Sequence, residues 1–133
     1  MKVHQYCYFA LKSATVSAGE ITARLGMAPD EAQVLGSRSA EHRLPRMHAW
    51  KVTHCGQGPI DDQIEGLIGR LAPVRPGIRT LVDEGASAVL QVVRYFHHRD
   101  GGEEFGWQLS PAVIAFLAEA AAALDVDEYD LSE

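Results

Sequence analysis

Two short segments of the chain concentrate side chains that could do chemistry. The first is residues 95–106, YFHHRDGGEEFG, which places two histidines before a glycine pair and two glutamates after it. On a strand, His97 and His98 project to opposite faces, so one metal ion could not easily bind both. A histidine paired with Glu103 or Glu104 across a hairpin would supply only two ligands, whereas zinc usually takes at least three from protein. We interpret this segment as a solvated turn, with a metal site as the alternative.

The second segment, residues 38–54 (RSAEHRLPRMHAWKVTH), gathers positive charge in a chain whose net charge is −6. Only Glu41 opposes its cationic side chains. Because guanidinium groups fork onto phosphate and carboxylate, the segment predicts a site for a small anionic ligand or an acidic protein partner. The alternative is that these charges pair with acidic residues of the same molecule. The candidate ligand-binding residues are Arg38, Arg43, Arg46, His48 and Lys51.

The histidines support a second hypothesis, a small metal-dependent or acid/base enzyme. It would use residues from the set His48, His54, His97 and His98. The sequence contains no G-x-S-x-G, P-loop, G-x-G-x-x-G or H-E-x-x-H pattern, so it assigns no catalytic residue, metal or cofactor. We therefore rank a non-catalytic binding module first. A third option is a homo-oligomer formed through an exposed sheet face or edge.

Composition limits the class of protein further. The chain has 133 residues, enough for one domain (1–133), and 47% hydrophobic against 23% charged residues is ordinary for a globular protein. Its acidic balance argues against nucleic-acid binding, which needs a basic surface. No apolar run approaches the roughly 18 residues of a membrane span, and no secretory signal is present. Two cysteines, Cys7 and Cys55, are too few for a disulfide framework, so we expect a cytoplasmic protein.

Strand patterns recur along the chain and place the candidate residues. Apolar side chains on both faces predict central strands at 3–13 and 87–96. Clean alternation predicts a strand over 48–55, in which Trp50 is a core residue. A short strand is expected around 32–35, and the segment from 36 to 46 is expected to be a loop.

Helix signals lie between these strands. Ser17 and Gly26 are typical of the two ends of a helix, and a long helical segment with a break at Pro73 is predicted over 60–84. Ser110-Pro111 predicts the start of a helix that reaches about Leu124.

The last strands complete the expected fold. Segment 103–109 is predicted to return as the hairpin partner of strand 87–96. The tail is predicted to form an edge strand with Tyr129 and Leu131 turned inward and with Glu128 and Asp130 turned outward. The fold class is α+β: a single sheet with a ferredoxin-like βαββαβ core, extended by a C-terminal β-α-β, with the helices mainly on one face.

Three quoted stretches carry a family resemblance: YFALKSATVSAGEITARLGMAPDEA, HAWKV and LSPAVIAFLAEAAAALDVDEYDL. Together they resemble DUF4279, a bacterial family known only as a domain of unknown function. The shared positions, including Tyr8-Phe9, Leu25-Gly26, Trp50 and Ser110-Pro111, are mainly capping and core positions. The resemblance implies a small, single-domain cytoplasmic protein of bacteria, and it implies no reaction, cofactor or catalytic residue.

Overall fold

A computed structural model describes residues 4–54, 56–97 and 106–131 of the chain. Its elements follow the predicted order β-α-β-β-α-β, with the second helical segment broken in two, and one further helix and strand come after them. The elements in order are β1 (His4–Ser13), α1 (Ala18–Leu25), β2 (Glu31–Gln33), β3 (His48–His54), α2 (Ile60–Leu71), the 3-10 turn η1 (Ala72–Val74), α3 (Arg75–Asp83), β4 (Ser87–Phe96), α4 (Pro111–Ala120) and β5 (Ala123–Asp130).

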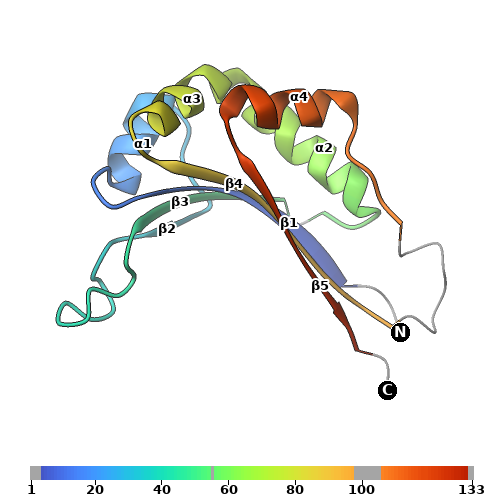
Figure 1. Cartoon of the computed structure of the whole chain (residues 1–133), viewed down its shortest axis with the longest axis horizontal. Coiled ribbons are helices and arrows are strands. Elements are labelled where there is room, and N and C mark those ends of the chain that lie inside the picture. Colours follow the sequence, from blue (N-terminus) through green and yellow to red (C-terminus); the bar gives the residue numbers. More distant parts are fainter. Residues whose placement is uncertain (1–3, 55, 98–105, 132–133) are drawn as a thin grey trace.

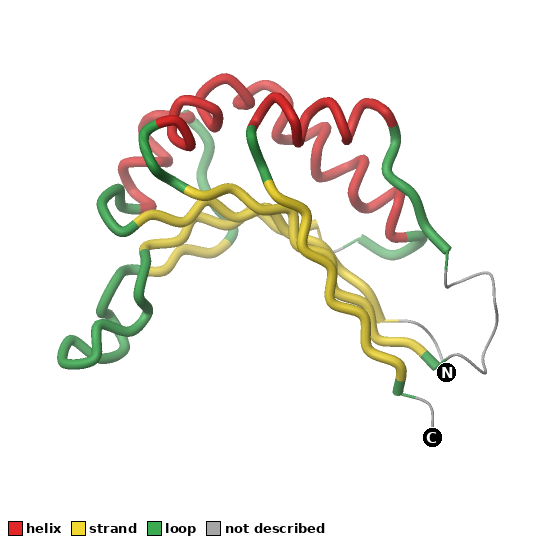
Figure 2. Tube along the Cα trace, in the orientation of Figure 1, coloured by secondary structure: helices red, strands yellow, loops and turns green. Residues whose placement is uncertain are grey.

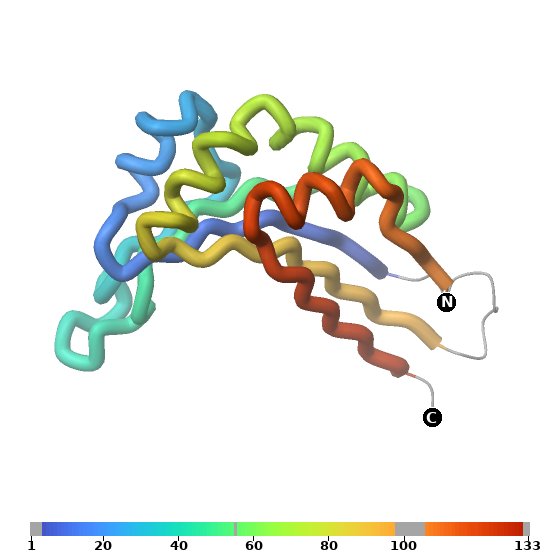
Figure 3. Tube along the Cα trace, turned by 45° about the horizontal axis from the view of Figure 1, so that its top comes forward, coloured from blue at the N-terminus to red at the C-terminus, as the bar shows by residue number. Residues whose placement is uncertain are grey.

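The strands form one mixed sheet in the order β2-β3-β1-β4-β5, so the fold is α+β. β1 is antiparallel to both of its neighbours, β3 and β4, and β2 is antiparallel to β3, whereas β4 and β5 are parallel. Figure 3 shows β1, β4 and β5 side by side. In Figures 1 and 2 the helices lie together on one side of the sheet, and the sheet bends so that its uncovered face is on the inside of the bend.

The face of the sheet beneath the helices forms the core. Cys7, Phe9 and Leu11 alternate along β1, and all three are fully buried. Trp50 is also fully buried, as predicted, and its indole N–H donates a 3.3 Å hydrogen bond to the carbonyl of Met27. The buried side chains of the helices that cover this face include Ile21, Ile64, Leu67, Ile78 and Phe116.

Local capping signals place the helix starts. The Ser17 hydroxyl accepts from the backbone N–H of Glu20 at 3.1 Å, and Gly26 ends α1 with φ 70°. The Ser110 hydroxyl accepts from Val113 at 3.2 Å at the start of α4. Both starts confirm the prediction, because a side-chain acceptor satisfies an N–H that the first helical turn leaves free.

The predicted end of α4 is wrong. The helix ends at Ala120 because Ala121 adopts a left-handed conformation with φ 55°, and the predicted last residues, Ala123 and Leu124, belong to β5 instead. No glycine marks this end, so the sequence gives no stop signal there. The break in the second helical segment is confirmed, because Pro73 lies in η1 between α2 and α3.

The predicted hairpin after β4 is also wrong in the described residues. The stretch from Gly106 to Leu109 forms no strand, and β4 already has β1 on one side and β5 on the other. The C-terminal extension of the sheet is therefore β5 alone, which reaches β4 through α4. The turn interpreted at 98–105 lies outside the described residues, as does Cys55.

β5 is the predicted edge strand, but its side chains are turned the other way. Tyr129 is paired with Tyr95 on the uncovered face and is 45% exposed, so it is not turned into the core, and Leu131 is 46% exposed. Glu128 points to the helix side instead of outward. Its carboxylate accepts from the buried guanidinium of Arg94 at 2.9 Å.

Arg94 is the least expected residue of the core, being only 1% exposed. It donates to the amide oxygen of Gln5 at 3.2 Å as well as to Glu128, so one side chain links β1, β4 and β5. The indole N–H of Trp107 donates to the other oxygen of Glu128 at 3.2 Å. A buried charge needs such partners, because an uncompensated one is costly. Arg94 therefore ties the edge strand to the centre of the sheet.

Candidate functional site

The uncovered face of the sheet presents a continuous row of polar and aromatic side chains. Strand pairing sets this row, because residues opposite each other project to the same face. Tyr8 lies opposite Thr53 on β3 and Gln91 on β4, and Tyr6 lies opposite Val93. Because no helix covers this side in Figure 2, the row is available to a partner.

One end of this face is aromatic and acidic. The rings of Tyr95 and Tyr129 stack with their centroids 4.9 Å apart, and His4 stacks on Tyr95 at 6.0 Å. Asp127 accepts a 3.1 Å hydrogen bond from the side-chain amide of Gln91. We call this surface the tyrosine–aspartate end and define it as Tyr6, Tyr95, Asp125, Asp127 and Tyr129, all on the uncovered face.

The hydroxyls of Tyr6 and Tyr8 are held in their neutral form. Burial, followed by the nearby Tyr95 and Tyr129, raises the pKa of Tyr6 above its ordinary value. Burial raises the pKa of Tyr8 in the same way, with Tyr6 and Asp125 adding to it. These phenols therefore remain hydrogen-bond donors at neutral pH, and they do not act as bases.

The opposite end of the face is basic. The ammonium of Lys51 lies 5.0 Å from the centre of the Tyr8 ring, in a cation–π contact. Lys51 is paired across the sheet with Ala10 on one side and Glu31 on the other. It therefore lies on the uncovered face, at the end of the β2–β3 pairing that is farther from the loop joining these strands.

That loop, residues 34–47, is held by its own backbone and projects away from the helices (lower left in Figure 1). Arg38 donates its backbone N–H to the carbonyl of Leu44 at 2.8 Å, and Gly36 donates to Pro45 at 2.9 Å. Ser39 and Leu44 form an antiparallel bridge across it. We call this segment the arginine loop.

The guanidinium groups of the arginine loop have no partner among the described residues. Arg38, Arg43 and Arg46 are exposed, and no ion pair or side-chain hydrogen bond of theirs occurs there. The other arginines of the described chain all form ion pairs, namely Arg24 with Glu84, Arg70 with Asp30, Arg75 with Glu119, Arg79 with Asp83 and Arg94 with Glu128. In the part of the chain that the structure describes, the arginines of the loop therefore do not pair with acidic residues of the same molecule.

His48 does not join these arginines. Its Nδ1 accepts the backbone N–H of Leu35 at 3.1 Å, on the helix side of the sheet, so it fastens the base of the loop. Of the five predicted ligand-binding residues, the structure brings Arg38, Arg43 and Arg46 together on one loop. It places Lys51 on the adjoining face and His48 beneath that face.

The histidines of the enzyme hypothesis do not converge in the described chain. His48 and His54 are at opposite ends of β3, about 20 Å apart at the rise of a strand. His97 follows the end of β4, and its Nε2 is buried without a hydrogen-bond partner, while His98 lies outside the described residues. Among residues 4–54, 56–97 and 106–131, no three His, Cys, Asp or Glu side chains are arranged to hold a metal ion.

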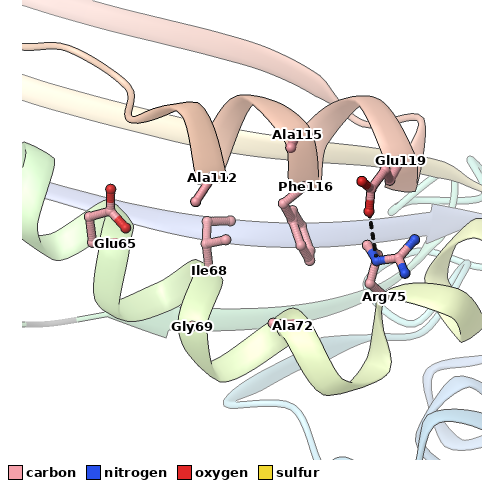
Figure 4. Close-up of a pocket in the computed structure, with 9 residues that line it drawn as sticks. All are labelled: Glu65, Ile68, Gly69, Ala72, Arg75, Ala112, Ala115, Phe116 and Glu119. Atoms are coloured by element: carbon pink, nitrogen blue, oxygen red, sulfur yellow. Dashed lines mark ion pairs between the residues drawn. The ribbon is translucent and has the colours of Figure 1, made fainter.

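A separate hollow of about 390 Å³ lies between α2 and α4 on the helix layer. Figure 4 shows Ala112, Ala115 and Phe116 facing Ile68 and Gly69 across it. Arg75 and Glu119, whose side chains are 3.0 Å apart, lie at one end. The strand and helix patterns of the sequence do not predict this hollow, although small residues at helical spacing on both helices are a signal for it. Its apolar lining contains no group arranged for catalysis.

Comparison with known proteins gives one finding. The model of a protein family described as "Domain of unknown function (DUF4279)" matches residues 2–131, nearly the whole chain. No curated protein and no solved structure matches.

Proposed function

The chain belongs to the DUF4279 family, a domain of unknown function, and we propose that it is a non-catalytic binding module. The arginine loop, with Lys51 on the adjoining sheet face, would bind a small anionic ligand or the acidic surface of a protein partner. The strand order β2-β3-β1-β4-β5 supports a ferredoxin-like core of β1 to β4, with β5 added at the edge. Such a core leaves one sheet face for recognition when the helices pack on the other.

The observation that carries this proposal is the contrast between paired and unpaired arginines. Five arginines on the rest of the described surface and core have carboxylate partners, and the three on the arginine loop have none there. The net charge is −6, so the molecule has more carboxylates than basic side chains with which to form such pairs. An exposed cluster of cations in an acidic protein attracts anions locally.

The loop also meets a second requirement of a binding site, because its geometry is set before a ligand arrives. The hydrogen bonds of Arg38 and Gly36 to Leu44 and Pro45 hold the loop backbone in one arrangement. His48 fixes the start of the loop through Leu35. Preorganisation of this kind reduces the entropy that ordering the loop would otherwise cost on binding.

Two defined probes test the proposal: inorganic phosphate and a short polyglutamate peptide, titrated while backbone amide shifts are followed by NMR. We expect both probes to shift amides of the arginine loop. The double variant Arg38→Gln, Arg46→Gln should weaken binding by about tenfold or more, since a charge-assisted bond contributes on the order of 1.4 kcal/mol or above. Its free energy of unfolding should stay within about 0.5 kcal/mol of the parent's, because the two side chains are exposed.

A matched control removes the same charge elsewhere. The variant Arg75→Gln, Arg79→Gln changes two ion-paired arginines on α3, of which Arg75 is half-buried and Arg79 is exposed. It should bind both probes as the parent does. If neither probe shifts the loop, or if the control weakens binding as much as the loop variant, the proposal is refuted, because net charge rather than the loop would then govern binding.

A further inference from the structure

The two ends of the uncovered face are opposite in charge. The arginine loop contributes three cations without a partner in the described chain, and the tyrosine–aspartate end contributes the exposed carboxylates Asp125 and Asp127. On β1, seven residues separate Tyr6 from Ser13, which pairs with His48 at the base of the loop. That is about 23 Å, well beyond the roughly 8 Å over which charges interact at physiological salt, so the ends do not neutralise each other within one molecule.

Both ends also expose apolar side chains. Seven large apolar side chains are exposed in the described chain. Three of them, Val34, Leu44 and Met47, lie on the arginine loop, and Tyr129 and Leu131 lie at the opposite end. An exposed apolar group beside a charge is typical of protein interfaces, in which arginine and aromatic residues form the strongest contacts.

This pattern is self-complementary. In a two-fold symmetric dimer, the first patch of one copy contacts the second patch of the other copy, and the reverse contact forms as well. With the axis through the middle of the uncovered face, the arginine loop of one copy would lie on the tyrosine–aspartate end of its partner, and the same contact would be repeated once. Because the uncovered face is on the inside of the bend and the loop projects on that side, the two copies would meet mainly at the loop and at the opposite end of each sheet (Figure 1).

We propose that the partner of the arginine loop is a second copy of this chain, docked through the uncovered sheet faces in a two-fold dimer. The inference rests on the proposed function, because it names the acidic surface that the loop binds. The strands have 10, 3, 7, 10 and 8 residues, which at a rise of about 3.3 Å and a spacing of about 4.8 Å span on the order of 600 Å². A stable interface buries about 800 Å² on each partner, so the arginine loop must supply part of the contact.

A charge-swap experiment tests this dimer. One variant reverses the loop (Arg38→Glu, Arg46→Glu), and the other reverses the opposite end (Asp125→Lys, Asp127→Lys). Each pure variant places like charges in contact twice, so its dimerisation should weaken by about tenfold or more. Mixed in equal amounts, they should form a heterodimer as tight as the parent dimer, because both of its contacts again join opposite charges. Native mass spectrometry separates the three species by mass, and sedimentation velocity gives the dissociation constants.

The control carries the same reversal on the helix layer (Arg75→Glu, Arg79→Glu) and should dimerise as the parent does. Circular dichroism spectra identical to the parent's show that each variant is folded. A parent chain that stays monomeric at the highest concentration reached, or a mixture that associates no better than its components, overturns the inference. If phosphate and polyglutamate still shift the loop amides in that case, the proposed function stands and only the identity of the partner is wrong.

Discussion

Two glycines three residues apart in α2 should respond in opposite ways to the same substitution. A Cβ built on Gly69 meets no atom within 4 Å, because this residue borders the hollow between α2 and α4. A Cβ built on Gly66 would lie 2.8 Å from Cε1 of His54 and 3.3 Å from its Nδ1. The change to alanine is therefore free of contact at one site and forces a contact at the other.

The magnitudes follow from helix propensity and from overpacking. Alanine stabilises a helix interior relative to glycine by about 0.5–1 kcal/mol, and Gly69→Ala should gain that amount. At Gly66 the same gain is opposed by a clash that the His54 ring cannot easily relieve, because the ring also lies close against Gly56. Overpacking typically costs about 1–3 kcal/mol, so Gly66→Ala should be a net destabilisation of up to about 2 kcal/mol.

Urea unfolding of four proteins measures the effect: the two glycine variants, His54→Ala, and the double variant Gly66→Ala, His54→Ala. In the His54→Ala background the clash is gone, so Gly66→Ala should again stabilise by about 0.5–1 kcal/mol. A Gly66→Ala protein as stable as Gly69→Ala would refute the reasoning. So would a loss that persists without the imidazole ring, because the ring would then not be its cause.

Two further predictions concern charged groups. Glu128→Gln removes the negative charge beside buried Arg94 and should lower the free energy of unfolding by about 1–3 kcal/mol in chemical denaturation. Glu119→Gln, which changes a more exposed ion pair, should lower it by less than about 1 kcal/mol. Equal losses would contradict the role given to Arg94. The backbone N–H of Thr53, followed by Arg70, lowers the pKa of Asp30, so the stability that Asp30 contributes is complete above its unfolded pKa of about 4 and is lost as the pH falls below it. The difference in Tm between the parent and Asp30→Asn should therefore shrink between about pH 6 and pH 2, and a difference that does not change with pH would exclude this linkage.

The parts of the fold that sequence patterns predict are those with local causes. Ser17, Gly26 and Ser110 act within one helical turn, so the caps they predict are present. β1 and β4 are central in the strand order, as predicted, although helices cover only one face of the sheet (Figure 2). Trp50 is a core residue because its strand alternates, so that every second side chain faces the core.

Other features depend on contacts between distant residues, which a pattern does not encode. The hairpin expected after β4 competes with β5, and the parallel pairing of β4 with β5 excludes it along β4. Arg94 lies in an apolar strand, and its burial is made tolerable by contacts with residues distant in sequence, among them Gln5 and Glu128, 89 and 34 residues away. The positive charge of segment 38–54 is visible in the sequence. That its three arginines lack partners in the described chain is a property of the folded surface.

The two tryptophans occupy contrasting places in the fold, so their fluorescence reports on two different parts of it. Trp50 is fully enclosed on β3 and bonded to a backbone carbonyl, which is a rigid, apolar setting for an indole. Trp107 is half-buried at the opposite edge, where its indole donates to the carboxylate of Glu128 on β5. Their fluorescence therefore reports separately on the β3 side and on the β5 edge of the sheet. Replacing either indole by phenylalanine isolates the signal of the other, so the release of β5 is distinguishable from the opening of the β3 side.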